Sequence, residues 1–196
     1  MRPRVAPGAW RYAVGALGLG LLLTVVSGPL GVALALAAPL AVLAFHRDPE
    51  RTPPTEGVVA PADGTVSVLR EEGDRVRVGI YMSPTDVHVN RAPAPGRVEA
   101  VEHEPGGHRP AFSKESEHNE RLHVRCGEYT LTLVAGAFAR RIHPYVEVGD
   151  RLDRGERVGH ISFGSRADVL LPADVSLADV AVEQGESVTA GETRLV

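Results

Sequence analysis

The feature that most constrains this chain is a long uncharged stretch near its start. Two apolar runs, residues 12–26 and 30–45, follow one another with only Ser27-Gly28-Pro29 between them. A spanning helix needs about 20 apolar residues and a bilayer core is about 30 Å thick, so each run is short and one continuous helix would be too long. Glycine followed by proline favours a break. We therefore expect an N-terminal transmembrane or re-entrant helical hairpin within residues 1–45, with one bent span as the second choice.

Basic residues at the N-terminus set the expected orientation of this anchor. Arg2, Arg4 and Arg11 precede or open the apolar stretch, and residues 1–45 contain no acidic residue. Because positively charged flanks stay on the cytoplasmic side, a hairpin returns the chain to the cytoplasm. A cleaved signal peptide fits less well, since two apolar runs follow one another. We expect localisation at the cell membrane, with the remaining domain on the cytoplasmic side.

Composition excludes several classes of function for the rest of the chain. Residues 46–196 hold 18 of the 21 Lys and Arg and all 25 Asp and Glu, without a basic run, which argues against general nucleic-acid binding. The single cysteine, Cys126, excludes an intrachain disulfide and a cysteine-based zinc site. One stretch is rich in histidine and glutamate, but the spacing fits no standard zinc pattern, so no metal is expected: Glu102, His103, Glu104, His108, Glu117, His118 and His123.

Turn formers and alternation predict that residues 46–196 are mainly β. This part contains 15 Gly and 11 Pro, which leaves little room for helices. Apolar and polar residues alternate over residues 75–80 and 129–133, as in half-buried strands. Residues 48–57, with three prolines, are expected to form the extended linker from the membrane to the domain.

An internal repeat refines this fold prediction. Residues 149–156 and 185–192 share the pattern Gly-acid-x-aliphatic-x-x-Gly-Glu, and residues 57–66 supply a "PADGTV" strand. Together they resemble the barrel-sandwich hybrid of lipoyl and biotinyl carrier domains. That resemblance implies a fold and no function. The only lysine, Lys114, lies far from any such turn, so no carrier lysine is available.

Seven segments occur in an order that resembles one enzyme family. They are "FHRDPERTPP", "VVAPADGTV", "YMSPTDVHVNRAP", "NER", "AGAFARRI", "RGERVGHISFGSRADVLLP" and "GESVTAGET". From about Phe45 to the C-terminus the chain looks like the short form of phosphatidylserine decarboxylase. The resemblance implies decarboxylation of a serine phospholipid, either phosphatidylserine or archaetidylserine. It also implies a proenzyme that cuts itself between Gly164 and Ser165. The two products, chains 1–164 and 165–196, would stay together as a heterodimer, and a higher oligomer is a further option.

The same resemblance assigns roles to individual residues. Ser165 would become a covalent pyruvoyl group, which forms a Schiff base with the serine amine and accepts the electrons left by CO₂. His88 would donate the proton that quenches the carbanion, because histidine changes protonation near neutral pH. Asp63 matches the aspartate that assists self-cleavage. Guanidinium groups bind carboxylate and phosphate, so four arginines are candidates for substrate binding: Arg91, Arg121, Arg140 and Arg141.

One departure and one rival function remain open. Longer family members carry a second histidine three positions after the one matching His88, where this chain has Arg91, a poor general base. Either His88 serves both steps, or Asp63 acts through a water molecule. The rival is a non-enzymatic, membrane-anchored hybrid-barrel adaptor, which would remain one chain.

Overall fold

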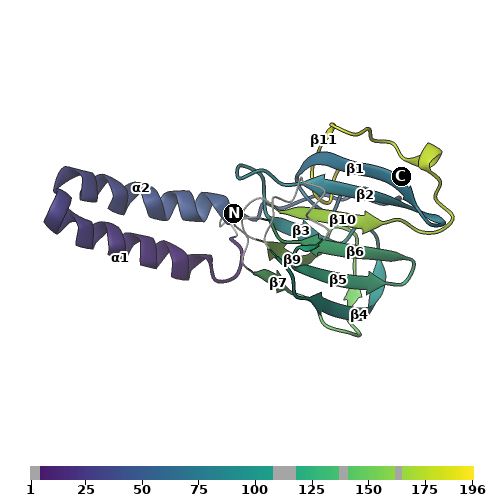
Figure 1. Cartoon of the computed structure of the whole chain (residues 1–196), viewed down its shortest axis with the longest axis horizontal. Coiled ribbons are helices and arrows are strands. Elements are labelled where there is room, and N and C mark those ends of the chain that lie inside the picture. The colour runs from purple at the N-terminus through teal and green to yellow at the C-terminus, as the bar shows by residue number, and fades with distance from the viewer. Residues whose placement is uncertain (1–4, 108–117, 137–140, 162–164) are drawn as a thin grey trace. The chain divides into compact units, whose positions relative to one another are not determined.

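The computed structural model describes residues 5–107, 118–136, 141–161 and 165–196, in two compact units, Met1–Pro49 and Glu50–Val196. In the first unit, helices α1 (Ala9–Ser27) and α2 (Pro29–Phe45) form a hairpin (Figure 1). Gly28, at φ 52°, separates them, and its N–H donates to the Thr24 carbonyl at 2.9 Å. Glycine tolerates this backbone and proline suits the first turn of a helix, so the break falls where the sequence predicts it.

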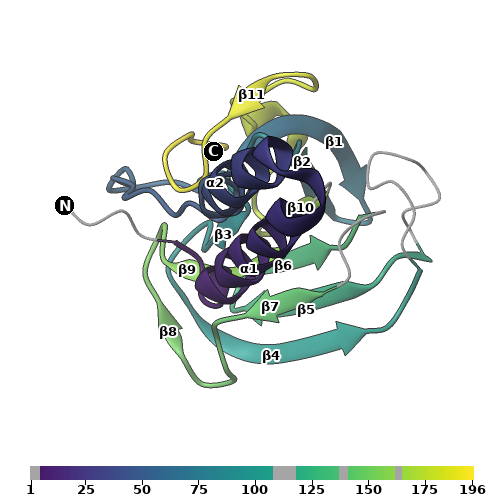
Figure 2. The same ribbon diagram turned by 90° about the vertical axis from the view of Figure 1, so that its left-hand side faces the viewer.

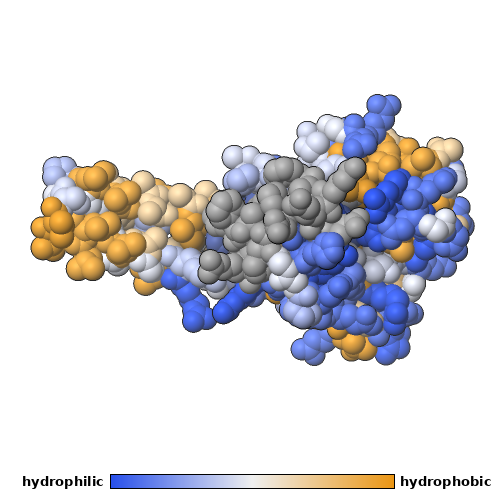
Figure 3. All heavy atoms as spheres, in the orientation of Figure 1, coloured by the Kyte–Doolittle hydropathy of each residue, from blue (hydrophilic) through white to orange (hydrophobic). Residues whose placement is uncertain are grey.

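The two helices pack through small residues and turn large apolar side chains outward. A Cβ on Gly20 would overlap Ala35, and one on Gly31 would overlap Thr24, so both glycines permit close helix contact. Leu22, at 67 %, and Val26, at 87 %, lie among the most exposed side chains, and hydrophobic atoms dominate the hairpin surface in Figure 3. By length and composition, α1 is able to cross a membrane, whereas α2 has 17 residues.

The second unit is mainly β, as predicted. An eight-stranded antiparallel sheet has the order β11-β1-β2-β10-β6-β5-β4-β8, and a three-stranded sheet has the order β3-β9-β7. The large sheet is strongly curled (Figure 2). A short 3₁₀ helix, η2 (Leu177–Asp179), lies between β10 and β11. The strands are β1 (Gly64–Glu72), β2 (Arg75–Tyr81), β3 (Val89–Arg91), β4 (Gly96–Glu104), β5 (Arg121–Cys126), β6 (Tyr129–Val134), β7 (Ile142–Pro144), β8 (Arg151–Leu152), β9 (Arg157–Ile161), β10 (Arg166–Leu170) and β11 (Ser187–Val188).

The core lies between the two sheets. Val78 and Ile80 of β2 are buried as the alternation predicts, and they belong to one apolar cluster with Leu133 of β6 and Ile161 of β9. A Cβ on Gly159 of β9 would stand 3.3 Å from the Leu133 side chain, so the sheets approach closely there. The other face of the large sheet carries polar side chains, which fits a sheet with one face on the core.

The sequence repeat is a repeat of local structure. Gly149 and Gly155 have φ values of 102° and 76°, and their counterparts Gly185 and Gly191 have 94° and 73°. Each repeat contains a short strand, and these strands, β8 and β11, form opposite edges of the large sheet. The duplicated turns are therefore confirmed. The lipoyl- or biotinyl-type barrel-sandwich assignment is not confirmed. The strands of the two repeats lie instead at the two edges of one curled eight-stranded sheet.

Candidate active site

Ser165 is completely buried at the entrance to a central strand. It stands immediately before β10, which pairs with β2 on one side and β6 on the other. The Met82 N–H donates to the Ser165 carbonyl at 2.9 Å, and Ser165 Oγ lies 4.0 Å from Met82 Sδ. The backbone of the serine is therefore fixed, while its hydroxyl meets a polarisable and weakly accepting sulfur atom.

A tight turn after β2 presents His88. The Asp86 carboxylate accepts the Ser83 N–H at 2.7 Å, and the Asp86 N–H donates to the Ser83 carbonyl at 3.0 Å. His88 is 3 % exposed, and its Nδ1 lies 3.0 Å from the Asp86 carbonyl oxygen. A carbonyl oxygen only accepts, so Nδ1 is the donor in this hydrogen bond and carries a hydrogen.

Met82 and His88 each bond to a described residue on one side of the predicted cleavage site. The Ile161 N–H donates to the His88 carbonyl at 3.3 Å, while Met82 holds Ser165 as described. Ile161 and Ser165, the described residues before and after the predicted cut, therefore both bond to the stretch from Met82 to His88. Gly164, the predicted partner in the scissile bond, lies outside the described residues, as does Arg140.

Asp63 stands at the same end of the large sheet. Thr65, Tyr81 and Arg166 face one another across β1, β2 and β10. Asp63 and Ser165 therefore precede their strands at the same end of the sheet, separated by two strand spacings of about 4.8 Å each. The structure thus gathers the three predicted catalytic residues around the end of β2.

The Asp63 carboxylate has two close partners that the sequence did not reveal. Arg51 Nη2 donates to its oxygens at 2.7 and 3.0 Å, and the Ala190 N–H donates at 2.8 Å. Arg51 also reaches Glu192 at 3.2 Å. From the sequence, Arg51 is only a residue of the linker, yet in the structure it fixes the orientation of Asp63. The long separation between Asp63 and the turn at Ala190 explains why no local pattern indicated the contact.

The described candidate arginines occupy three different places. Arg91 is buried, and its Nη1 donates to the Gly155 carbonyl at 2.8 Å, against the first repeat turn. Arg121 begins β5 and is in register with Val134 and, across it, Arg166 on the polar face of the large sheet. Arg141 is exposed just before β7. Substrate binding by any of them stays a prediction.

A network of ion pairs lies on the polar face of the large sheet. One of its members, Arg166, follows Ser165 directly in the sequence. Arg166 donates to Asp168 at 2.6 Å, and Arg77 reaches Asp168 at 3.4 Å and Glu72 at 2.5 Å. The hydrogen bond from Arg77 lowers the pKa of Glu72 to about 2. Since Ala167 and Val169 point into the core, this network lies on the opposite face of β10 and stabilises the strand that follows the serine.

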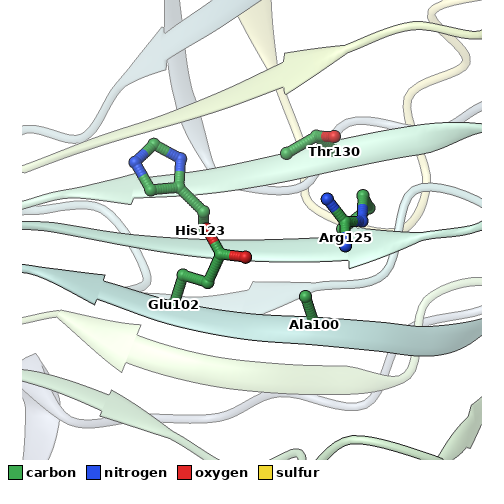
Figure 4. A pocket seen from close by; sticks show the side chains of 5 residues that line it. All are labelled: Ala100, Glu102, His123, Arg125 and Thr130. Carbon is green, nitrogen blue, oxygen red and sulfur yellow. The ribbon is translucent and has the colours of Figure 1, made fainter.

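A shallow depression of about 270 Å³ lies on the same polar face (Figure 4). Its side chains come from β4, β5 and β6: Ala100, Glu102, His123, Arg125 and Thr130. His123 Nε2 lies 3.3 Å from Glu104, and His103 Nε2 lies 2.9 Å from Glu120, so these histidines pair with carboxylates. Among the described residues, no three side chains of His, Cys, Asp or Glu form a group that could hold a metal ion.

A second group of histidines lies in the small sheet. His143 and His160 stack with ring centroids 4.5 Å apart, and Tyr145 Oη lies 2.6 Å from His160 Nδ1. His160 is one residue before Ile161, which bonds to the His88 carbonyl, so this pair is an alternative to His88 as a proton carrier. The sequence assigns no role to Met82 or Asn90, although both lie in the motif that contains His88.

The β domain places a buried serine, a buried histidine and a carboxylate bound by Arg51 near the same end of its large sheet. This combination of side chains is typical of an enzyme. The chain belongs to the phosphatidylserine decarboxylase family, whose sequence model matches residues 40–196.

Relatives agree with this assignment over nearly the whole chain. A protein of Halobacterium salinarum, provisionally named an archaetidylserine decarboxylase proenzyme, is 60 % identical over 191 residues, 96 % of each chain. A phosphatidylserine decarboxylase proenzyme of Streptomyces avermitilis is 45 % identical over 204 residues, covering 99 % of this chain and 94 % of the relative. The family supports a decarboxylase, and the word proenzyme in these names implies that the relatives mature by cleavage.

Proposed function

We propose that this protein decarboxylates a serine phospholipid with a pyruvoyl group made from its own Ser165. The observation that carries the proposal is the placement of Ser165, completely buried at the start of β10, with its carbonyl held by Met82. The names of the relatives contain both archaetidylserine and phosphatidylserine, so the shared serine headgroup defines the substrate class. The purified, detergent-solubilised protein should release CO₂ from phosphatidylserine or archaetidylserine, and release from neither lipid would contradict the proposal.

Maturation would use the bond between Gly164 and Ser165. The Ser165 hydroxyl attacks the Gly164 carbonyl, the amide C–N bond breaks, and an ester replaces it. Elimination then releases the Gly164 carboxylate, and hydrolysis of the remaining residue releases ammonia. Because β10 pairs with β2 and β6, and β11 pairs with β1, residues 165–196 stay in the sheet after the cut. This pairing supports a heterodimer of the two chains.

The surroundings of Ser165 fit a pyruvoyl group. Complete burial shields a ketone from water, and the Met82 N–H anchors the same carbonyl before and after the cut. The ketone would supply the electrophile for the serine amine and take up the electron pair released with CO₂. His88 is assigned the proton that replaces the lost carboxylate, because histidine changes protonation near neutral pH.

We expect Arg51 to control self-cleavage through Asp63. In Arg51→Ala the Asp63 carboxylate loses its cationic partner and keeps the Ala190 N–H as a donor. Loss of hydrogen bonds to a charged group costs about 1.5–3 kcal/mol. Self-cleavage should slow, and Arg51→Lys should restore part of the rate because it restores the charge. The measurement is the uncut fraction over time after cell-free synthesis.

Arg70→Ala is the matched control for this arginine. Arg70 pairs with Glu72 at 3.3 Å, but its side chain is 56 % exposed, and exposed pairs contribute about 0–1 kcal/mol. This variant should cut at the wild-type rate. Wild-type cutting in Arg51→Ala as well would contradict the link from Arg51 to Asp63.

The apolar hairpin is proposed to hold the enzyme at its lipid, with the β domain on the cytoplasmic side. The full chain should remain in the membrane pellet through a carbonate wash, because α1 alone has the length of a span. Removal of residues 1–49, the first compact unit, should release a β domain that still cuts itself, since Asp63, His88 and Ser165 all lie in the second unit. Extraction of the full chain by carbonate would contradict the anchor.

A further inference from the structure

Asn90 has a completely buried polar side chain that makes only one weak hydrogen bond with the described residues. It is 0 % exposed, and its Nδ2 donates to Met82 Sδ at 3.5 Å, a weak acceptor. Its Oδ1 accepts no hydrogen bond from the described part of the chain. The large majority of buried side-chain polar atoms are hydrogen-bonded, and one without a partner destabilises the fold. An apolar residue of the same shape would serve this position better if packing were its only task.

The position of Asn90 suggests what that task is. The Met82 sulfur that receives its amide also lies 4.0 Å from Ser165 Oγ, so both side chains converge on one atom. Asn90 lies in β3 and pairs with Gly159 of β9, and two residues further along β9 the Ile161 N–H bonds to the His88 carbonyl. The irregularity in the pairing of β3 with β9 falls only after Asn90. The unmet carbonyl oxygen therefore lies in the neighbourhood of the reacting serine and the proton carrier.

We propose that Asn90 is a further catalytic residue, whose Oδ1 accepts a hydrogen bond from the primary amine of the substrate as it reaches residue 165; this assignment rests on the proposed function. A neutral amide suits the task, because the amine needs its lone pair to attack a ketone. A carboxylate at the same place would favour the protonated ammonium form, which has no lone pair. The amide oxygen orients an N–H bond without adding charge to a buried site.

A catalytic role and a purely structural role of the Asn90 amide predict different effects of its replacement on the stability of the protein. Asn90→Leu keeps the shape and removes an unmet acceptor, at the expense of the weak hydrogen bond to sulfur. Its melting temperature should equal or exceed that of the wild type, while kcat/KM for phosphatidylserine should fall about 10–10²-fold, the effect of one hydrogen bond to a substrate nitrogen. Self-cleavage should be complete, because the amine arrives only after maturation.

Asn119→Leu is the matched control. Asn119 is also a buried asparagine, but its Nδ2 donates to the Ala135 carbonyl at 2.7 Å. Its replacement should lower the melting temperature, since it deprives that carbonyl of this donor. Asn90→Asp provides a second readout, because it keeps an acceptor and adds charge: the rise of activity with pH should move to higher pH as the carboxylate holds the amine protonated.

The experiment uses the full chain in detergent and measures intact mass, melting temperature and the pH profile of decarboxylation. Wild-type kcat/KM in Asn90→Leu, or a parallel fall in its melting temperature and activity, would overturn the assignment of Asn90. An uncut Asn90→Leu chain would also overturn it, by placing Asn90 in maturation. If the wild type is uncut and releases no CO₂, the proposed function itself fails, whatever the Asn90 variants do.

Discussion

Ser165→Ala is expected to remain a single chain of 20.8 kDa with no decarboxylase activity. The substitution removes the oxygen that attacks the Gly164 carbonyl, so neither the cut nor the ketone forms. The buried site tolerates the smaller side chain, because the interaction between the serine Oγ and Met82 Sδ is long, at 4.0 Å, and weak. Folding should therefore be retained, and intact mass spectrometry with a thermal melt checks both points.

Ser187→Ala is the control for this variant. Ser187 lies in the same predicted small chain but is exposed in β11, so its replacement should leave cutting and turnover unchanged. A Ser165→Ala protein that still splits at this position would refute the maturation mechanism. A protein that stays whole in the wild-type form as well would favour the adaptor function.

His88→Ala is expected to lower decarboxylation by about 10²–10⁴-fold, the usual loss for a general acid. Its effect on maturation distinguishes the two explanations for Arg91 at the position of the missing histidine. If His88 is also the base for self-cleavage, the variant stays uncut. If Asp63 acts through a water molecule, the variant is cut normally and carries an inactive small chain. Turnover and intact mass, measured on the same preparation, separate these outcomes.

His103→Ala is the control for the histidine. The His103 side chain is 51 % exposed and paired with Glu120, so its replacement should not change turnover. Near-normal turnover in His88→Ala would contradict the role of His88. The acid would then be sought in the stacked pair His143 and His160, where Tyr145 already bonds one ring.

Local patterns predicted the elements of the fold but not their assembly. The break at Gly28, the alternation in β2 and β6, and the duplicated glycine turns all depend on neighbours within a few residues, and each is confirmed. The order of the eight strands, and the placement of β8 and β11 at opposite edges, depend on pairings between distant segments. No periodicity in the chain encodes those pairings.

The residues of the candidate site divide in the same way, into those that local motifs indicate and those that only the fold brings together. Ser165, His88 and Asp63 are candidates from the sequence because they lie in motifs of the family, and their catalytic roles stay predictions. Arg51 and Met82 are not such candidates, since a linker arginine and an apolar methionine become relevant only when the fold brings them to Asp63 and Ser165. Asn90 lies within the motif that contains His88. The sequence does not reveal that its side-chain carbonyl oxygen is buried without a donor among the described residues.

The central claim is that Ser165 becomes the reactive group, and the mass of the C-terminal fragment tests it most directly. The purified wild-type protein should yield a fragment of residues 165–196, of about 3.5 kDa at roughly 110 Da per residue, because the hydroxyl of Ser165 cuts the chain before it. The N-terminal residue of this fragment should carry a ketone in place of its amine, and reduction with cyanoborohydride in the presence of phosphatidylserine should add lipid mass to it. A single mass of 20.8 kDa that gains no lipid under reduction would contradict the account.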